Sequence, residues 1–383
     1  MKFTLNDFYK CADSKRISAH YNTDRTLVGF KYTPETVYSL KWDDVSLCSR
    51  GITFDTQTGE IIAFPFKKFF NFEELYDSQT MQTTELFDKI PKEYHCSDIA
   101  GKFRVMEKYD GSLGIAFNYK DKWFVKTSGS FDSEQAVWAT KYLNENCRTD
   151  LMNKDYTYCF EIIYNEDVHP IHYDFEGLVL LGIIDKRTGI ELPLSDILKY
   201  DGIFRTAKVY EFSDFRNVYN FAKKRGSNAE GVVVTFEDGW KTKIKGDKFL
   251  ELQKFFHNVN KEEIWKRFNW LTKKYDDFDF ILNIPEELKT LKDYAEELPK
   301  MFDEKEYEMV IKSMKVKDRF PELWCRVKVK LVGEDRKKVW EYINNEITSD
   351  KTEAGIIIKI IEDDMNFRKL IWMLLKPKGE KNV

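Results

Sequence analysis

The chain has 383 residues, and its 61 Lys and Arg against 65 Asp and Glu leave a formal net charge of only −4 at pH 7. Hydrophobic residues make up 42% and aromatic residues 15% of the chain, which excludes a largely disordered protein. The near balance of charge excludes a protein that is basic throughout, so any surface that binds nucleic acid has to be local. At about 100–200 residues per domain, the length predicts more than one domain.

No apolar run approaches the about 18 residues that a membrane-spanning helix needs. The first residues, MKFTLNDF, lack the apolar centre of a secretory signal peptide. The cysteines are scattered, without a Cys-x-x-Cys pair and without a histidine at zinc-ligand spacing. We therefore expect a cytoplasmic protein with reduced cysteines and no membrane partner.

Short apolar runs separated by turn dipeptides dominate the chain from Leu27 to about Lys245. This pattern predicts a mainly antiparallel sheet arrangement with a few inserted helices. Hairpins are predicted at residues 51–64, 113–127 and 232–245, where two strand-like runs flank a short polar turn. Residues 133–143 predict a helix with Ser133 as its N-cap.

The pattern of apolar and polar residues changes after Gly246, where the alternation typical of strands largely disappears. Amphipathic stretches follow at residues 281–301, 337–347 and 356–375. The change predicts a sheet-rich domain over residues 1–250 and an all-α domain over residues 251–383.

A candidate nucleophile is Lys108, which ends an apolar strand just before the turn Asp110-Gly111. A lysine amine held at a rigid strand end is a nucleophile if its pKa is lowered. Gly111 would allow close approach of a bulky ligand to the backbone. A surface hairpin with an incidental lysine has the same pattern and stays open as the alternative.

A second lysine cluster lies in Lys241, Lys243 and Lys245. Alternate residues of a strand share a face, so these three side chains should point the same way, with Ile244 pointing into the core. A polyphosphate among the three cations would relieve their repulsion, and their field would depress the pKa of a nearby nucleophilic lysine. The alternative is a solvated edge strand protected by lysines.

Two glutamates stand in unusual places. Glu161 lies inside an otherwise apolar strand, and Glu230 directly precedes the hairpin that carries the lysines. Such a carboxylate needs a partner, and a ribose hydroxyl, a lysine or Mg²⁺ would serve, unless the glutamates face solvent. His169 and His172 flank Pro170 without a third ligand nearby, so we interpret them as ordinary loop histidines.

The order of several motifs resembles that of the covalent nucleotidyltransferase superfamily of ligases and capping enzymes. These motifs are Lys-x-Asp-Gly-Ser at 108–112, Phe-Glu-Ile at 160–162, Glu-Gly-Val-Val at 230–233 and Lys-Ile-Lys at 243–245. Further elements are similar to one branch, the ATP-dependent RNA ligases of T-even bacteriophages that repair tRNA. They are Cys-Ser-Arg-Gly-Ile at 48–52, Lys-Lys-Phe-Phe-Asn at 67–71 and Lys-Thr-Ser-Gly-Ser at 126–130.

The resemblance implies an α+β protein in which an N-terminal antiparallel-sheet nucleotidyltransferase domain, of the ATP-grasp-like ligase type, precedes an all-α RNA-specificity domain. It implies that Lys108 attacks the α-phosphate of ATP. The implied roles of the other residues are phosphate contacts for Lys243 and Lys245, the β/γ end for Arg50 and Lys68, the nucleoside for Phe70 and Tyr32, the ribose for Glu161, the metal or nucleoside for Glu230, and the metal for Asp276.

Departures from that pattern occur at Ser128, where the family often has a lysine, and at Phe249, where it tends to have a tyrosine. The first implies that one phosphate contact is missing or comes from Lys126, and the second removes any role of a hydroxyl. A basic stretch from Lys315 to Lys338 is either an RNA-facing patch or a solvated helix face.

The resemblance implies a monomeric ATP-dependent RNA ligase that uses Mg²⁺ and joins 5′-phosphate and 3′-hydroxyl ends through a lysine–AMP intermediate. Its implied substrate is cleaved tRNA, and its location is the host cytoplasm if it is viral. One alternative is a DNA ligase or capping enzyme, whose last motif is usually followed by a small β-barrel that this sequence does not predict. Another is a non-catalytic RNA-binding protein on a ligase scaffold.

Overall fold

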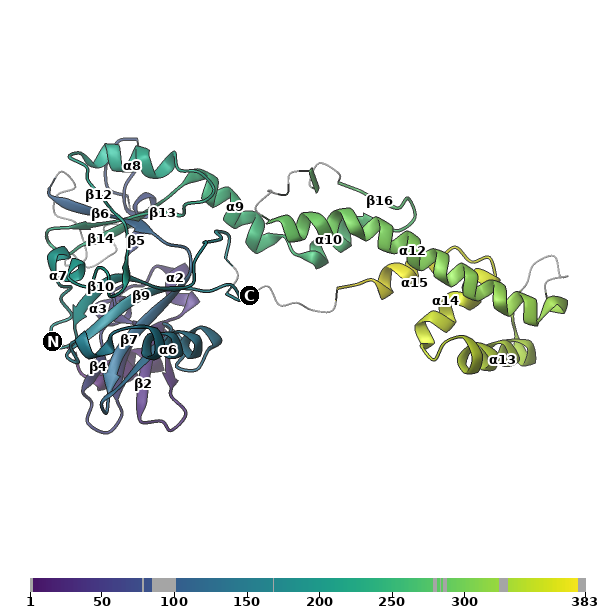
Figure 1. Cartoon of the computed structure of the whole chain (residues 1–383), viewed down its shortest axis with the longest axis horizontal. Coiled ribbons are helices and arrows are strands. Elements are labelled where there is room, and N and C mark those ends of the chain that lie inside the picture. The colour runs from purple at the N-terminus through teal and green to yellow at the C-terminus, as the bar shows by residue number, and fades with distance from the viewer. Residues whose placement is uncertain are drawn as a thin grey trace. The chain divides into compact units, whose positions relative to one another are not determined.

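The computed structural model describes residues 3–77, 79–84, 101–167, 169–277, 281–282, 284, 288–323 and 330–377. The chain divides into two compact units, Met1–Glu251 and Leu252–Val383 (Figure 1). Each unit has hydrophobic clusters of its own. Within the described ranges, no helix combines the length and apolar character that a membrane crossing demands.

The first sheet of the N-terminal unit is antiparallel and has the strand order β1-β2-β3-β4. Its elements and neighbouring helices are α1 (Leu5–Asp13), β1 (Ile17–Tyr21), β2 (Leu27–Tyr32), α2 (Pro34–Ser39), α3 (Asp44–Cys48), β3 (Arg50–Asp55) and β4 (Ile61–Ala63). Helix α1 covers this sheet through Phe8, whose ring lies 5.3 Å from that of Phe30 and 5.0 Å from that of Phe54.

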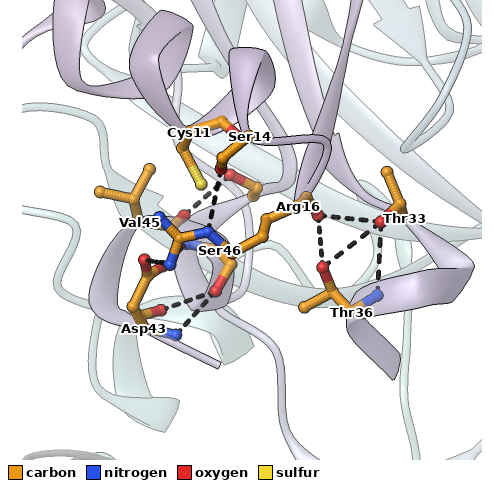
Figure 2. A network of polar contacts seen from close by, with 9 residues as sticks. Cys11, Ser14, Arg16, Thr33, Thr36, Asp43, Val45 and Ser46 are labelled. Atoms are coloured by element: carbon orange, nitrogen blue, oxygen red, sulfur yellow. Dashed lines mark hydrogen bonds and ion pairs between the residues drawn. The ribbon is translucent and has the colours of Figure 1, made fainter. Parts of the chain in front are cut away.

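A polar network around Arg16 ties the beginning of β1 to the two short helices (Figure 2). The guanidinium of Arg16 forms an ion pair with Asp43, whose carboxylate accepts a hydrogen bond of 2.8 Å from Ser46 N at the start of α3. The carbonyl of Arg16 accepts a hydrogen bond of 2.7 Å from the Thr36 hydroxyl of α2. The network therefore fixes the position of α3, and with it the point at which the chain enters β3.

The second sheet has the order β11-β10-β9-β7-β8 and is antiparallel except for the β10–β11 pair. Its strands are β7 (Ser112–Tyr119), β8 (Lys122–Lys126), β9 (Tyr156–Ile163), β10 (Gly177–Asp185) and β11 (Arg205–Thr206). The accompanying helices are α6 (Glu134–Asn146), η2 (Thr149–Leu151) and α7 (Leu194–Leu198). The predicted cap of α6 is confirmed, because Ser133 Oγ accepts a hydrogen bond of 3.3 Å from Ala136 N.

The third sheet has the order β12-β6-β13-β14-β5, with β14 and β5 parallel. Its strands are β5 (Phe70–Asn71), β6 (Phe103–Lys108), β12 (Val209–Tyr210), β13 (Gly231–Phe236) and β14 (Lys241–Lys245). Helices α4 (Phe72–Leu75) and α8 (Phe215–Lys223) pack on it, and Figure 1 shows α8 lying over these strands. In the register of this sheet Gly231 lies opposite both Lys108 and Lys245, which brings the ends of three strands together.

The predicted hairpins are confirmed as the antiparallel pairs β3–β4, β7–β8 and β13–β14. The mainly antiparallel character is also confirmed, with the two parallel pairings as exceptions. The fold of this unit is therefore a mixed α+β arrangement.

The C-terminal unit is mostly helical. Its elements are α9 (Asp247–Asn258), which begins in the first unit, α10 (Lys261–Arg267), β15 (Phe268–Asn269), β16 (Lys274–Tyr275), α12 (Lys289–Arg319), η4 (Pro321–Leu323), α13 (Gly333–Tyr342), the π-helical turn η5 (Ile343–Ile347), α14 (Lys351–Ile361) and α15 (Phe367–Leu374). Isoleucines of α14 fill its core, and Trp265 stacks on Trp372 with ring centroids 3.9 Å apart.

The prediction of an all-α second domain is wrong in one respect, because β15 and β16 form a small antiparallel hairpin. Asn269 Oδ1 accepts hydrogen bonds from Leu271 N and Thr272 N, and Lys273 adopts a left-handed conformation, so local turn chemistry interrupts the helices.

The predicted amphipathic stretches also differ from the observed helices. The helix predicted over residues 356–375 is broken at Asp363, which is left-handed with φ 55°. The stretch 337–347 continues from α13 into η5. The stretch 281–301 falls partly outside the described residues, and α12 extends beyond its predicted end to Arg319.

Candidate active site

A cavity in the N-terminal unit is lined by strands of all three sheets. Its charged lining residues are Arg50, Glu107, Lys108, Glu161, Glu230, Lys241, Lys243 and Lys245. Its other walls are mostly apolar and are formed by Phe66, Phe69, Met106, Tyr109, Leu113, Leu181, Ala207 and Val233. The structure therefore brings six of the predicted site residues together, namely Arg50, Lys108, Glu161, Glu230, Lys243 and Lys245.

Lys108 and Lys245 share one carboxylate. Lys108 Nζ lies 2.6 Å from Glu230 Oε2, and Lys245 Nζ lies 3.0 Å from Glu230 Oε1. Glu230 is only 2% exposed, so the two cations replace the water that its charge has lost. Gly231 makes this approach possible, because a Cβ there would lie 2.0 Å from the Ile244 carbonyl oxygen.

The protonation of Lys108 differs from the prediction. Burial lowers the pKa of Lys108, but the carboxylates of Glu230, Glu161 and Asp110 outweigh burial and raise the pKa above its usual value. The field of the neighbouring lysines was expected to depress it, and that expectation is wrong for the free protein. The reason is that the Glu230 carboxylate lies 2.6 Å from the Lys108 amine, and Glu161 and Asp110 add further negative charge.

The turn after Lys108 is held by Glu161. Gly111 N donates a hydrogen bond of 3.0 Å to Glu161 Oε1, and Asp110 N donates one of 2.9 Å to the Tyr173 hydroxyl. A side chain at Gly111 would clash, because its Cβ would lie 2.5 Å from the Ile162 carbonyl oxygen. Burial raises the pKa of Glu161 to about 7, and the charge of Lys108 opposes this.

The lysines of β14 differ in their partners. Lys241 pairs with Glu191 at 2.7 Å and Lys245 pairs with Glu230, whereas Lys243 has no ion pair among the described residues. Burial and the charges of Lys68, Lys108, Arg50 and Lys245 lower the pKa of Lys243 to about 7. As predicted, Ile244 is fully buried on the other face. Lys243 therefore occupies a place that an anion would stabilise.

Arg50 and Lys68 also lack a carboxylate partner within the part of the chain that the structure describes. The Arg50 guanidinium lies 4.6 Å from the centroid of the Phe69 ring, and Lys68 Nζ lies 4.6 Å from that of Phe70. Burial lowers the pKa of Lys68 to about 8. Together with Lys243, these side chains form a basic region in which no cation has an ion pair with a described carboxylate.

Tyr32, Lys68 and Phe70 do not line the cavity. They surround Trp42, whose ring lies 5.1 Å from that of Tyr32 and 5.5 Å from that of Phe70. Phe70 is 3% exposed and belongs to a hydrophobic core cluster. Their roles in nucleoside and phosphate binding stay predictions.

Neither Ser128 nor Phe249, the two departures from the family pattern, lines the cavity. Lys126 is buried, its Nζ donates a hydrogen bond of 3.3 Å to the Gly51 carbonyl, and burial lowers its pKa to about 7. It does not line the cavity. Phe249 is fully buried, and Lys245 Nζ lies 5.1 Å from the centroid of its ring.

Asp276 lies in the C-terminal unit and is exposed. Its carboxylate accepts a hydrogen bond of 2.8 Å from Asn269 Nδ2 and so supports the small hairpin. Among the described residues no group of three or more His, Cys, Asp or Glu side chains is arranged to hold a metal ion. The metal roles of Asp276 and Glu230 therefore stay predictions.

Several residues of the site were missed from the sequence. Phe66, Phe69 and Leu181 form apolar walls of the cavity, but they look like ordinary core residues in the chain. Tyr173 and His169 contact Asp110 from a distant loop. The phenylalanines within residues 64–72 were the one available signal, and their spacing does not distinguish a residue of the cavity wall from a residue of the hydrophobic core.

A model of the RNA ligase family matches residues 48–270, which is more than half of the chain. A candidate RNA ligase of Thermovibrio ammonificans is 29% identical over 146 residues, which cover 37% of this chain and 34% of that protein. The chain thus spans about a third of the length of this relative.

Two solved structures show weaker likeness. A Naegleria gruberi RNA ligase mutant with AMP and Mn has a TM-score of 0.34 and 18% identity, covering 43% of this chain and 59% of that one. A candidate ATP-dependent DNA ligase from Aquifex aeolicus has a TM-score of 0.45 and 13% identity, covering 98% of this chain and 100% of that one. At these TM-scores neither likeness supports a conclusion about this chain.

Proposed function

Because the chain belongs to the RNA ligase family, we propose that it is an ATP-dependent ligase that joins RNA 5′-phosphate and 3′-hydroxyl ends through a Lys108–AMP intermediate. One observation carries the proposal. The amine of Lys108 lies in a cavity with apolar walls, and the same cavity is lined by Lys243 and Arg50, two cations without an ion pair among the residues that the structure describes. The apolar walls suit a nucleobase, and the cations suit a polyphosphate.

In the first step the neutral amine of Lys108 attacks the α-phosphorus of ATP. A nitrogen–phosphorus bond forms, the bond from the α-phosphorus to the bridging oxygen breaks, and pyrophosphate leaves with the electron pair of that bond. The nitrogen gives up one proton to solvent. Lys243 and Arg50 stabilise this charge as it develops, with Lys68 nearby. The AMP then passes to an RNA 5′-phosphate, and a 3′-hydroxyl displaces AMP to form the phosphodiester.

The carboxylates of Glu230 and Glu161 fit the binding of Mg²⁺, because such an ion takes few protein ligands and fills its shell with water and substrate phosphate. Bound there, it would act as a Lewis acid on the phosphate oxygens. Glu230 is held by two lysines in the free protein, so it would exchange one of these contacts for the cation.

We assign RNA selection to the C-terminal unit and adenylylation to the N-terminal unit, with cleaved tRNA as the substrate and a monomer as the active form. Lys315, Lys317 and Arg319 at the end of α12 are exposed, as are Lys330 and Arg336–Lys338, which supports an RNA-facing patch. Arg326 and Lys328 of the same basic stretch lie outside the described residues.

Incubation with labelled ATP and Mg²⁺ in the absence of RNA tests the proposal. We expect an acid-labile AMP adduct on the wild-type protein, none on Lys108→Ala, and a normal adduct on Lys122→Ala, which changes an exposed lysine of β8. A parallel incubation with GTP separates a ligase from a capping enzyme. An adduct on the Lys108→Ala protein overturns the nucleophile, and no adduct on the wild type favours a non-catalytic RNA-binding protein.

A further inference from the structure

The loop between β9 and β10 lies against the turn that follows Lys108. From this loop His169 reaches toward Asp110, and its Nδ1 lies 3.6 Å from Asp110 Oδ1. Its other ring nitrogen, Nε2, lies 3.2 Å from Asp167 Oδ2. All three side chains are at most 25% exposed, so the imidazole bridges two carboxylates away from bulk water.

The same loop holds Asp110 at two further points. Ile171 N donates a hydrogen bond of 3.2 Å to Asp110 Oδ2, and Asp110 N donates to the Tyr173 hydroxyl. Asp110 thus has its backbone and both carboxylate oxygens engaged by one segment. Asp110 follows Lys108 by two residues, so this segment holds the turn that comes directly after the lysine.

Asp110 also acts on the nucleophile through its charge, since it is one of the carboxylates that raise the pKa of Lys108. Burial lowers the pKa of His169, but Asp110 and Asp167 outweigh burial and raise it to about 10. The ring is therefore an imidazolium at neutral pH. A positive charge beside Asp110 attracts its carboxylate and so helps to hold it in place.

We propose that His169 is a positioning residue for the lysine nucleophile, whose imidazolium holds Asp110, and with it the turn that follows Lys108, in place. This inference rests on the proposed adenylylation of Lys108. The role proposed for His169 does not involve a metal ion, and the sequence offered no third ligand near His169 and His172.

The groups that face His169 determine what a substitution does. Asp167 is itself held by Gln135 of α6, whose Nε2 donates a hydrogen bond of 3.0 Å, and by Ser112 of β7. The titratable residues around the small cavity at His169 are Asp110, Tyr164, Asp167, His172 and Tyr173. Removing the imidazolium leaves two carboxylates there without their shared cation.

The test measures single-turnover adenylylation of Lys108 from pH 6 to pH 10 in three variants. His169→Gln keeps a polar side chain but loses the charge that holds Asp110, so its rate should fall about tenfold. His169→Arg keeps a cation and should restore most of the rate. His172→Gln, a control at an exposed histidine of the same loop, should behave as wild type.

A second readout does not depend on ATP. Acylation of Lys108 by a small amine-reactive ester, followed by peptide mass spectrometry across the same pH range, should show the same loss in His169→Gln and the same recovery in His169→Arg. If the wild type forms no AMP adduct, the proposed function fails, and this readout alone still decides the role of His169.

Two results would overturn the inference. One is a wild-type profile for His169→Gln in both measurements. The other is a lowered rate in His169→Gln that His169→Arg does not restore, which would show a purely structural role. Melting temperatures of all variants identify any loss of folding, and His169→Arg keeps the comparison decisive if His169→Gln is unstable.

Discussion

Lys108 and Glu230 stand 122 residues apart in the chain, yet their side chains form an ion pair of 2.6 Å. The pair exists because β6 and β13 are neighbours in register, with Lys108 opposite Gly231. It keeps the amine protonated in the free protein, because Glu230 contributes most among the groups that raise the pKa of Lys108. An attacking amine has to be neutral, so the proposed reaction begins only when substrate binding weakens this ion pair.

Binding of ATP is expected to take up protons at pH 8. In the free protein burial lowers the pKa of Lys243 to about 7 and that of Lys68 to about 8. Phosphate charge beside these amines raises both pKa values, so on the order of one proton should enter per ATP. Calorimetry of the Lys108→Ala protein in buffers of different ionisation enthalpy measures this number without covalent chemistry.

The matched controls for this measurement are two further lysine substitutions in the same Lys108→Ala background. Lys243→Met should remove the larger part of the proton uptake. Lys122→Met changes an exposed lysine of β8 and should leave it unchanged. Equal uptake in all of these proteins would contradict the assignment of Lys243 to phosphate binding.

Lys126→Met is expected to stabilise the protein, and more at pH 7 than at pH 10. Burial and Lys31 lower the pKa of Lys126 from 10.5 to about 7. Between these values the unfolded chain binds more protons than the folded one, so the stability of the unsubstituted protein rises with pH in this window. At pH 7 most of the free energy that the lowered pKa of Lys126 costs the folded protein is still lost, and Lys126→Met should recover about 2 kcal/mol of it.

Urea denaturation at the two pH values measures the gain in stability from Lys126→Met. Lys122→Met, at an exposed lysine of the same strand, should change the midpoint little at either pH. A gain that is the same at pH 7 and pH 10 would show that the ammonium charge of Lys126 is not its source.

Gly231→Ala should destabilise the N-terminal unit and abolish adenylylation. A Cβ at residue 231 would lie 2.0 Å from the Ile244 carbonyl oxygen, so β13 and β14 would separate where Glu230 holds the two lysines, at a cost of about 3 kcal/mol or more. Gly239→Ala is the control, because φ there is also positive but no atom lies within 4 Å, and it should cost about 1 kcal/mol. Equal losses of stability in the two variants would refute the clash.

A protein that ends at Asn258 should still adenylylate Lys108, because all the cavity residues lie in the first unit. It should lose its preference for a broken tRNA anticodon loop over an unstructured oligonucleotide. Part of the salt dependence of joining should disappear with the basic stretch. Joining assays of both substrates across a salt series, with the full-length and shortened proteins, measure this. An unchanged tRNA preference would mean that the helical unit does not select the RNA.

Features set by neighbouring residues could be predicted from the sequence. The β3–β4 turn forms because Asp55 Oδ1 accepts hydrogen bonds from Gln57 N and Thr58 N, and the start of α6 forms because Ser133 caps it. The same holds for the face shared by Lys241, Lys243 and Lys245, which follows from strand alternation. The broken helix at Asp363 was missed, since a single left-handed residue hardly changes an apolar pattern.

The sequence by itself therefore determined which lysine is the candidate nucleophile and where the hairpins lie. It also determined which two glutamates need a polar or charged partner. Only the tertiary structure decided that Lys241 and Lys245 have ion pairs while Lys243 has none with a described residue, and that the pKa of Lys108 is raised. It also decided that His169 reaches Asp110. The physical reason is that an electrostatic interaction depends on the distance between charges and on their burial, and both are set by the pairing of strands far apart in the chain.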